Sequence, residues 1–181
     1  MQSLKMVGVF TPTCTSLKTT IDLLEKNLVN VRGTKDKRRE INILVSLGQA
    51  YMAVGDNSKA IAPFEQASAI ARELQDPQLE TAVLQSQGKA LGQISYSYFV
   101  QGDYAKTIQY SEQLRAIARE IKNPYFEVVA LGLLANSYQI TGTLPTRANA
   151  SKLLLITTKV KNQRKNQDFT FDYFLSPKAI A

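Results

Sequence analysis

One stretch of the sequence occurs twice in nearly the same form, and this repetition limits the possible folds more than any other feature. Residues 53–80 read AVGDNSKAIAPFEQASAIARELQDPQLE, and residues 100–127 read VQGDYAKTIQYSEQLRAIAREIKNPYFE. Each copy contains a Gly-Asp pair, then apolar residues at helical spacing, then a proline. Gly-Asp suits a short turn between two helices, and the proline can open the next helix. Each copy therefore predicts a turn, a helix and the start of another helix.

A second pattern precedes each turn. Large residues at spacings of three and four surround a small residue in three strings, Leu44-x-x-Leu47-Gly48-x-x-Tyr51, Leu91-x-x-Ile94-Ser95-x-x-Tyr98 and Leu131-x-x-Leu134-Ala135-x-x-Tyr138. The period is 47 residues and then 40. This spacing lines one face of a helix, and the small residue lets a neighbouring helix approach closely. The tyrosines recur in phase with that face, which favours packing over ligand stacking. Each unit is predicted to be a helical hairpin.

The first unit, which continues into Ala60-x-x-x-Phe64, resembles the tetratricopeptide repeat. The period near 40 and the strings AIARELQDP and AIAREIKNP are similar to the longer bacterial and cyanobacterial variety of that repeat. The second helices of the later units depart from the pattern. Polar residues stand there near the positions where the family prefers alanine and an aromatic residue, namely Thr107, Ser111, Arg147 and Ser151. The resemblance covers about residues 18–163 and implies stacked helical hairpins.

With a half repeat at the front, the predicted fold is an all-α, right-handed α-solenoid of antiparallel helical hairpins, about 3.5 repeats and seven helices long. The expected helices span 18–32, 38–54, 57–74, 79–101, 104–121, 125–141 and 144–161. Residues 1–17 are assigned to an N-terminal segment, 18–163 to the repeat solenoid and 164–181 to a C-terminal tail or cap. Because each hairpin contacts only its neighbours, we expect the degraded last unit to fray first.

The second unit holds seven extra residues between Pro77 and Leu91. Two helical turns take up about that many residues, so the apolar face keeps its register. We expect the lengthened helix to project beyond its neighbours. The stretch LETAVLQSQGKALG would then be either a local contact surface or a tolerated insertion, of which the second is more common.

Composition removes several classes of catalytic site. The chain has no histidine, which excludes imidazole triads, histidine metal sites and histidine pH switches. Its single cysteine, Cys14, lies in a threonine-rich segment and excludes an intrachain disulfide and thiolate clusters. Phosphate-binding glycine loops, a nucleophile elbow and carboxylates at metal spacing are also missing from the sequence. We therefore expect a protein that is not an enzyme and that uses no cofactor or metal.

Hydropathy bears on the compartment. No apolar run approaches the roughly 18 to 20 residues that a membrane helix needs, and residues 6–10 are too short for a secretory signal. We expect no membrane span and a cytoplasmic location.

The resemblance also implies a place for a partner protein. In tetratricopeptide proteins, the stripe beside the packing face lines a concave groove that selects an extended peptide or a helix. Here that stripe is Val45, Gln49, Met52, Gly92, Tyr96, Phe99, Gly132, Asn136 and Gln139. Its amides can pair with a peptide backbone, and its aromatic and methionine side chains offer apolar anchors. The alternative is that these residues are simply exposed or contact a neighbouring chain. Because the stripe holds no Lys or Arg, it departs from grooves that grip a C-terminal carboxylate.

Charge suggests a second kind of partner. The net charge is +7, and the excess lies at the ends: residues 41–158 hold nine basic and nine acidic side chains. The basic clusters are 35–39 and Lys159, Lys161, Arg164 and Lys165. Solvated charge is the ordinary explanation, and nucleic acid or an anionic surface is the alternative. Self-association through the solenoid ends, or a fragment of a larger repeat-containing signalling protein, are further alternatives.

The last segment differs from the repeats. From Asp168 it reads DFTFDYFLSPKAIA, which is aromatic and alternates in polarity. It can cover the exposed face of the last helix, as a terminal cap must, or serve as a docking segment for another protein.

Overall fold

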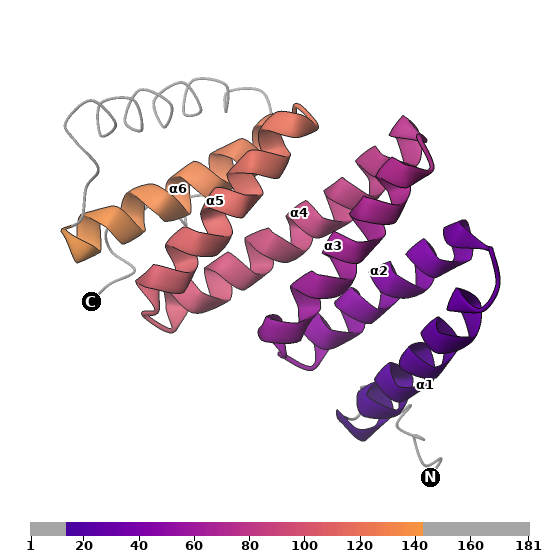
Figure 1. Ribbon diagram of the computed structural model, residues 1–181. Coiled ribbons are helices and arrows are strands. Elements are labelled where there is room, and N and C mark those ends of the chain that lie inside the picture. Colours follow the sequence, from indigo (N-terminus) through magenta and orange to yellow (C-terminus); the bar gives the residue numbers. More distant parts are fainter. Residues whose placement is uncertain (1–13, 143–181) are drawn as a thin grey trace, which may run out of the picture. The chain divides into compact units, whose positions relative to one another are not determined.

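The computed structural model describes residues 14–142, which form six helices joined by short turns (Figure 1). The helices are α1 (Cys14–Arg32), α2 (Lys37–Ala53), α3 (Asn57–Glu73), α4 (Pro77–Val100), α5 (Tyr104–Glu120) and α6 (Pro124–Thr141). Strands are absent from this part of the chain, and the predicted all-α class is confirmed. The α1 helix begins four residues before the predicted start at 18, and the other five helices agree within two residues. The seventh predicted helix, 144–161, lies outside the described residues.

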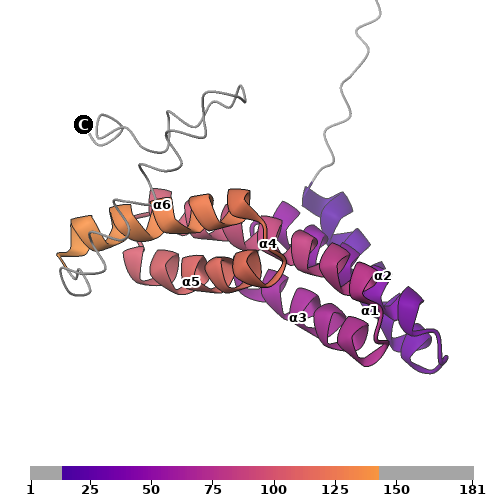
Figure 2. The same ribbon diagram turned by 90° about the horizontal axis from the view of Figure 1, so that it is seen from above.

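The six helices fall into two compact units, α1–α3 before Gln75 and α4–α6 after Leu74. In the first unit, α1 packs against α2, and α2 packs against α3. In the second unit, α5 packs against both α4 and α6, which also touch each other. Figure 2 shows α5 to one side of α4 and α6. Sequential packing of neighbouring helices is the property that defines an α-solenoid, and it holds within each unit. The right-handedness of the solenoid and the domain limits 18–163 stay predictions.

Polar caps fix where the helices begin. A side-chain oxygen of the capping residue accepts a hydrogen bond, 3.0–3.2 Å long, from the backbone N–H three residues later; the caps are Asp36, Asp56, Asp76, Asp103 and Asn123. Such a bond satisfies one of the N–H groups that a helix start leaves unpaired. The turns before α3 and α5 contain Gly55 and Gly102 at φ of +79° and +77°, where glycine is favoured. The predicted roles of the Gly-Asp pairs are confirmed.

The first unit closes around a contact between Gly48 of α2 and Phe64 of α3. The Phe64 side chain is fully buried, and a Cβ atom added at Gly48 would lie 2.5 Å from an atom of its ring. No side chain fits in that space, so only glycine lets the ring lie directly against the helix backbone. The predicted close approach of two helices at this small residue is confirmed.

The second unit uses the same kind of contact between a different pair of helices. A Cβ atom added at Gly88 of α4 would lie 2.5 Å from the ring of Phe126, which is buried and belongs to α6. The ring therefore comes from α6 and not from α5, which is the hairpin partner of α4. On α5 the position that matches Phe64 in the repeat is Ser111, which is too small to replace a phenyl ring.

The predicted lengthening of the second unit is confirmed in α4, which has 24 residues against 17 in α2. Gly88 lies between Pro77 and Leu91, and its contact with Phe126 means that this stretch packs against α6. The projection of the lengthened helix beyond its neighbours stays a prediction.

The departures of α5 from the repeat pattern do not prevent a regular helix. Both α5 and α3 have 17 residues. The Thr107 hydroxyl donates a hydrogen bond of 2.9 Å to the backbone oxygen of Asp103. The hydroxyl oxygens of Ser95 and Ser111 are buried and have no hydrogen-bond partner. Burying an unpaired polar group costs about 1–3 kcal/mol, so these serines lower the stability of the second unit. Arg147 and Ser151 lie outside the described residues.

Two glycines one turn apart in α4 allow a matched test of this packing. Gly88→Ala should lower the free energy of unfolding by about 1–3 kcal/mol, because the Phe126 ring must move. Gly92→Ala should raise it by about 0.5–1 kcal/mol, because alanine favours a helix. Its added Cβ would lie at an ordinary 3.7 Å from Leu114. Urea unfolding followed by circular dichroism measures both, and equal effects would contradict the role given to Gly88.

Candidate functional site

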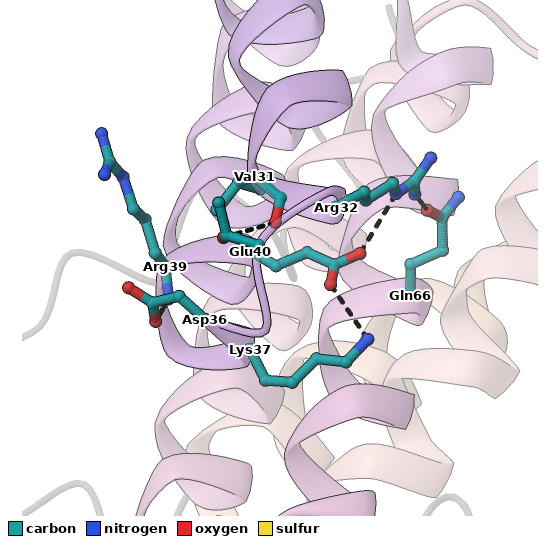
Figure 3. Close-up of polar contacts among 8 residues, drawn as sticks. Val31, Arg32, Asp36, Lys37, Arg39, Glu40 and Gln66 are labelled. Carbon is teal, nitrogen blue, oxygen red and sulfur yellow. Dashed lines mark hydrogen bonds and ion pairs between the residues drawn. The ribbon is translucent and has the colours of Figure 1, made fainter.

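The first candidate is a polar cluster around Glu40, which is buried in the first turn of α2. One carboxylate oxygen accepts a hydrogen bond from Arg32 Nε, and the other accepts one from Lys37 Nζ, each at 3.1 Å (Figure 3). Arg32 also donates from Nη2 to the side-chain oxygen of Gln66, at 2.7 Å. Arg32 ends α1 and Gln66 lies in α3. The cluster thus connects all three helices of the first unit.

The charges in this cluster are balanced. Burial by itself raises the pKa of Glu40, but the hydrogen bonds and positive charges of Lys37 and Arg32 outweigh it, and the pKa is lowered from 4.5. The carboxylate is therefore ionised at neutral pH and has both oxygens paired. A satisfied carboxylate of this kind stabilises the packing of helices and leaves nothing open for a ligand.

A weaker copy of the pair lies in the second unit. Arg119 Nε approaches Glu127 Oε1 at 3.5 Å, with the same separation of eight residues as Arg32 and Glu40. The Glu127 side chain is 36% exposed, whereas that of Glu40 is 6% exposed. Water screens the exposed pair, so its contribution to stability is small.

The two glutamates allow a test of burial with matched chemistry. Glu40→Gln should cost about 1–3 kcal/mol of unfolding free energy at neutral pH, and Glu127→Gln less than about 1 kcal/mol. Because the pKa of Glu40 is lower in the folded chain, its stabilising effect is complete above the ordinary carboxyl pKa and is lost as the pH falls through the folded value. Urea unfolding between neutral and acid pH should show the Glu40→Gln deficit shrinking. A deficit that stays constant with pH would contradict the ion-pair account.

Two of the three phased tyrosines are engaged within their own units. The Tyr51 hydroxyl donates a hydrogen bond to Glu25 of α1, which raises the pKa of Tyr51 to about 12. The Tyr98 ring stacks on Tyr110 at 5.5 Å between centroids, and Lys106 Nζ lies 4.8 Å from its centre. These rings are half-buried at the ends of the hairpins and make packing and cation–π contacts there.

The predicted groove stripe begins in the first unit with Val45, Gln49 and Met52, which all lie on α2. Gln49 is exposed, and Val45 and Met52 are half-buried. The three side chains are spaced by four and three residues, so they follow one face of the helix. They offer one amide between two apolar side chains.

The remaining predicted residues lie in the second unit, on α4 and α6. Tyr96 is 39% exposed, and Phe99 is half-buried with its ring against Tyr104, 5.8 Å between centroids. Asn136 is half-buried and Gln139 is exposed. The two glycines are packed inside: Gly92 is half-buried and Gly132 is buried. In the second unit, the side chains of this stripe that reach the surface are therefore concentrated in the C-terminal halves of α4 and α6.

The same surface includes two apolar residues that the sequence analysis missed. Val100 and Ile140, which match each other in the repeat, are 66% and 41% exposed. They lie four residues after Tyr96 and Asn136, which puts each pair on one helix face. That spacing is the signal that could have identified them. Tyr96, Phe99, Val100, Asn136, Gln139 and Ile140 are called the α4–α6 surface below.

Contacts at two glycines fix how α4 and α6 lie alongside each other. Gly88 meets Phe126, and an added Cβ at Gly92 would lie 3.9 Å from Val129. One turn along α4 thus corresponds to one turn along α6 in the same direction, so the helices are parallel here. The same register, extended toward the C-terminal ends of both helices, places Tyr96 and Val100 beside the C-terminal half of α6.

Other classes of site were sought in the described residues. Between residues 14 and 142, no three His, Cys, Asp or Glu side chains are grouped so that they could hold a metal ion. None of the six helices is long and apolar enough to cross a membrane. In the basic cluster 35–39, Asp36 caps α2 and Lys37 pairs with Glu40. The second basic cluster lies outside the described residues.

Comparisons with known proteins give a limited result. No protein-family model matches the chain, and no curated protein matches it significantly. The similar solved structures include two of nearly identical TPR-like repeats from a Podosopora anserina protein assigned as a kinesin light chain, the second being a methionine-substituted variant. They are 16% and 17% identical, each match covers 84% of this chain and 90% of the other, and both TM-scores are 0.34. The six helices in hairpin order and the close approach of α2 and α3 at Gly48 are consistent with tetratricopeptide-type repeats.

Proposed function

We propose that this protein is a non-enzymatic interaction module, or scaffold, in which the α4–α6 surface binds a peptide or helix of a partner protein. The observation that carries the proposal is the exposure of Tyr96 and Val100 on one face of α4, beside the amides of α6. The stripe of Val45, Gln49 and Met52 on α2 belongs to the other unit and stays a separate prediction. A cytoplasmic setting is part of the proposal.

The chemistry of the α4–α6 surface suits a polypeptide ligand. The amides of Asn136 and Gln139 offer donors and acceptors, which a peptide backbone needs for its own N–H and C=O groups. Tyr96, Val100 and Ile140 supply apolar area, and tyrosine is enriched among the residues that dominate binding energy. A small surface of mixed character favours micromolar rather than nanomolar affinity.

Tyr96→Ala and Phe99→Ala should each weaken partner binding by about 1–2 kcal/mol, or roughly 5- to 30-fold in Kd, without unfolding the chain. The first step is a pull-down from an extract of the source cell, with and without nuclease. Mass spectrometry then identifies partners kept by the intact chain and lost from the Tyr96→Ala/Asn136→Ala variant. Calorimetric titration of the identified partner with each variant gives the change in Kd.

The matched control is Tyr125→Ala, because Tyr125 is an exposed tyrosine of α6 at the other end of that helix. It should leave the Kd unchanged. If both tyrosine variants weaken binding equally, the α4–α6 surface is not the site. If material is kept equally by all variants and disappears with nuclease or moderate salt, the basic ends bind nucleic acid instead.

A further inference from the structure

The α4–α6 surface is uncharged over an unusual length of helix. Residues 90–102 and 128–142 contain no Asp, Glu, Lys or Arg, although the chain as a whole has a net charge of +7. On α4, one helix face carries Lys89, Gln93, Tyr96 and Val100 at spacings of four, three and four. Lys89 is exposed and forms no ion pair within residues 14–142. A ligand that fits this face is therefore apolar or aromatic, with an acidic group near Lys89.

One segment of the chain has this chemistry. Residues 168–175, DFTFDYFL, contain four of the fifteen Phe and Tyr residues, both acidic residues of the stretch 159–181, and no Lys or Arg. The aromatic side chains match the apolar area of Tyr96, Val100 and Ile140, and the two acids match Lys89. Binding to this face removes apolar area from water, which favours the contact. One ion pair at the edge of the face fixes the orientation of the bound segment.

The chain between the two parts is long enough. Twenty-six residues, 143–168, separate Gly142 from Phe169. When fully extended, these 26 residues span about 86 Å. The 18 residues of α6 measure about 27 Å. The segment can therefore reach the C-terminal half of α6 in the same molecule.

We propose that residues 168–175 bind the α4–α6 surface of their own molecule, with their aromatic side chains over Tyr96, Val100 and Ile140 and an aspartate at Lys89. The segment then acts as an internal ligand that a partner must displace. This inference rests on the proposed function in one respect, namely that the same surface binds polypeptide.

Two measurements on the full chain test the proposal. A carbodiimide joins an amine to a neighbouring carboxylate as an amide, and the adjacent groups should give a cross-link from Lys89 to Asp168 or Asp172. An equal mixture of ¹⁴N- and ¹⁵N-labelled chains should give products of one label only, because the contact is within one molecule. Lys89→Gln is the control that must remove this cross-link.

The second measurement is the affinity of a synthetic peptide with the sequence of residues 166–177. A tethered ligand competes at an effective concentration of about 1 mM, so for a segment with a Kd of about 0.1 mM its removal should strengthen peptide binding about 10-fold. We expect that gain in the full chain carrying Phe171→Ser and Phe174→Ser. Adding Val100→Ser and Ile140→Ser should abolish binding, whereas Val29→Ser, at an exposed valine of α1, should not change it.

The outcomes separate this inference from the proposed function. No cross-link and an unchanged peptide affinity overturn the inference, and mixed-label products overturn it in favour of contact between two molecules. If partner capture still depends on Tyr96 in those cases, the proposed function stands alone. If the cross-link and the 10-fold gain are found but no partner depends on Tyr96, the internal contact stands and the proposed function fails.

Discussion

The structure depends on a close approach between a helix backbone and an aromatic ring. Gly48 and Gly88 each leave a space in which the ring of a neighbouring helix lies, and that ring fills the centre of its unit. Each ring is buried because the glycine opposite it has no side chain. The surface residues of α4 and α6 are held in place by this interior contact, since the register between the two helices follows from it.

Local signals made much of the fold predictable. The starts of α4 and α6 follow from a capping Asp or Asn and the prolines Pro77 and Pro124, because caps act within a few residues of sequence. The partner of Gly88 could not be predicted in this way. The repeat pattern directs attention to the hairpin neighbour α5, but the ring comes from α6, and only the three-dimensional arrangement brings those residues together.

The candidate site was predictable in part. The repeat resemblance placed Tyr96 and Gln139 on a surface stripe, but it assigned the same stripe to Gly132, which is buried because α6 is apolar on most of its sides. Val100 and Ile140 were missed because their only signal, a position four residues after Tyr96 and Asn136, is weak when single exposed apolar residues are common. Lys37 was assigned to solvent, whereas it pairs with the buried Glu40. The spacing of three residues within one helix allows this pair, but the burial of Glu40 comes from the packing of the helices and is not visible in the sequence.

The extra length of α4 limits how this helix can change. Each residue of an α-helix advances by about 100°, so seven residues return to within about 20° of the starting direction. The residues before and after the addition can therefore both keep their packing contacts. The helix α4 gains length while its apolar side chains stay on one face. An addition of five residues would rotate one half of the helix by about 140° and direct its apolar side chains into water. A helix that packs on both sides of an addition can therefore gain seven residues but not five.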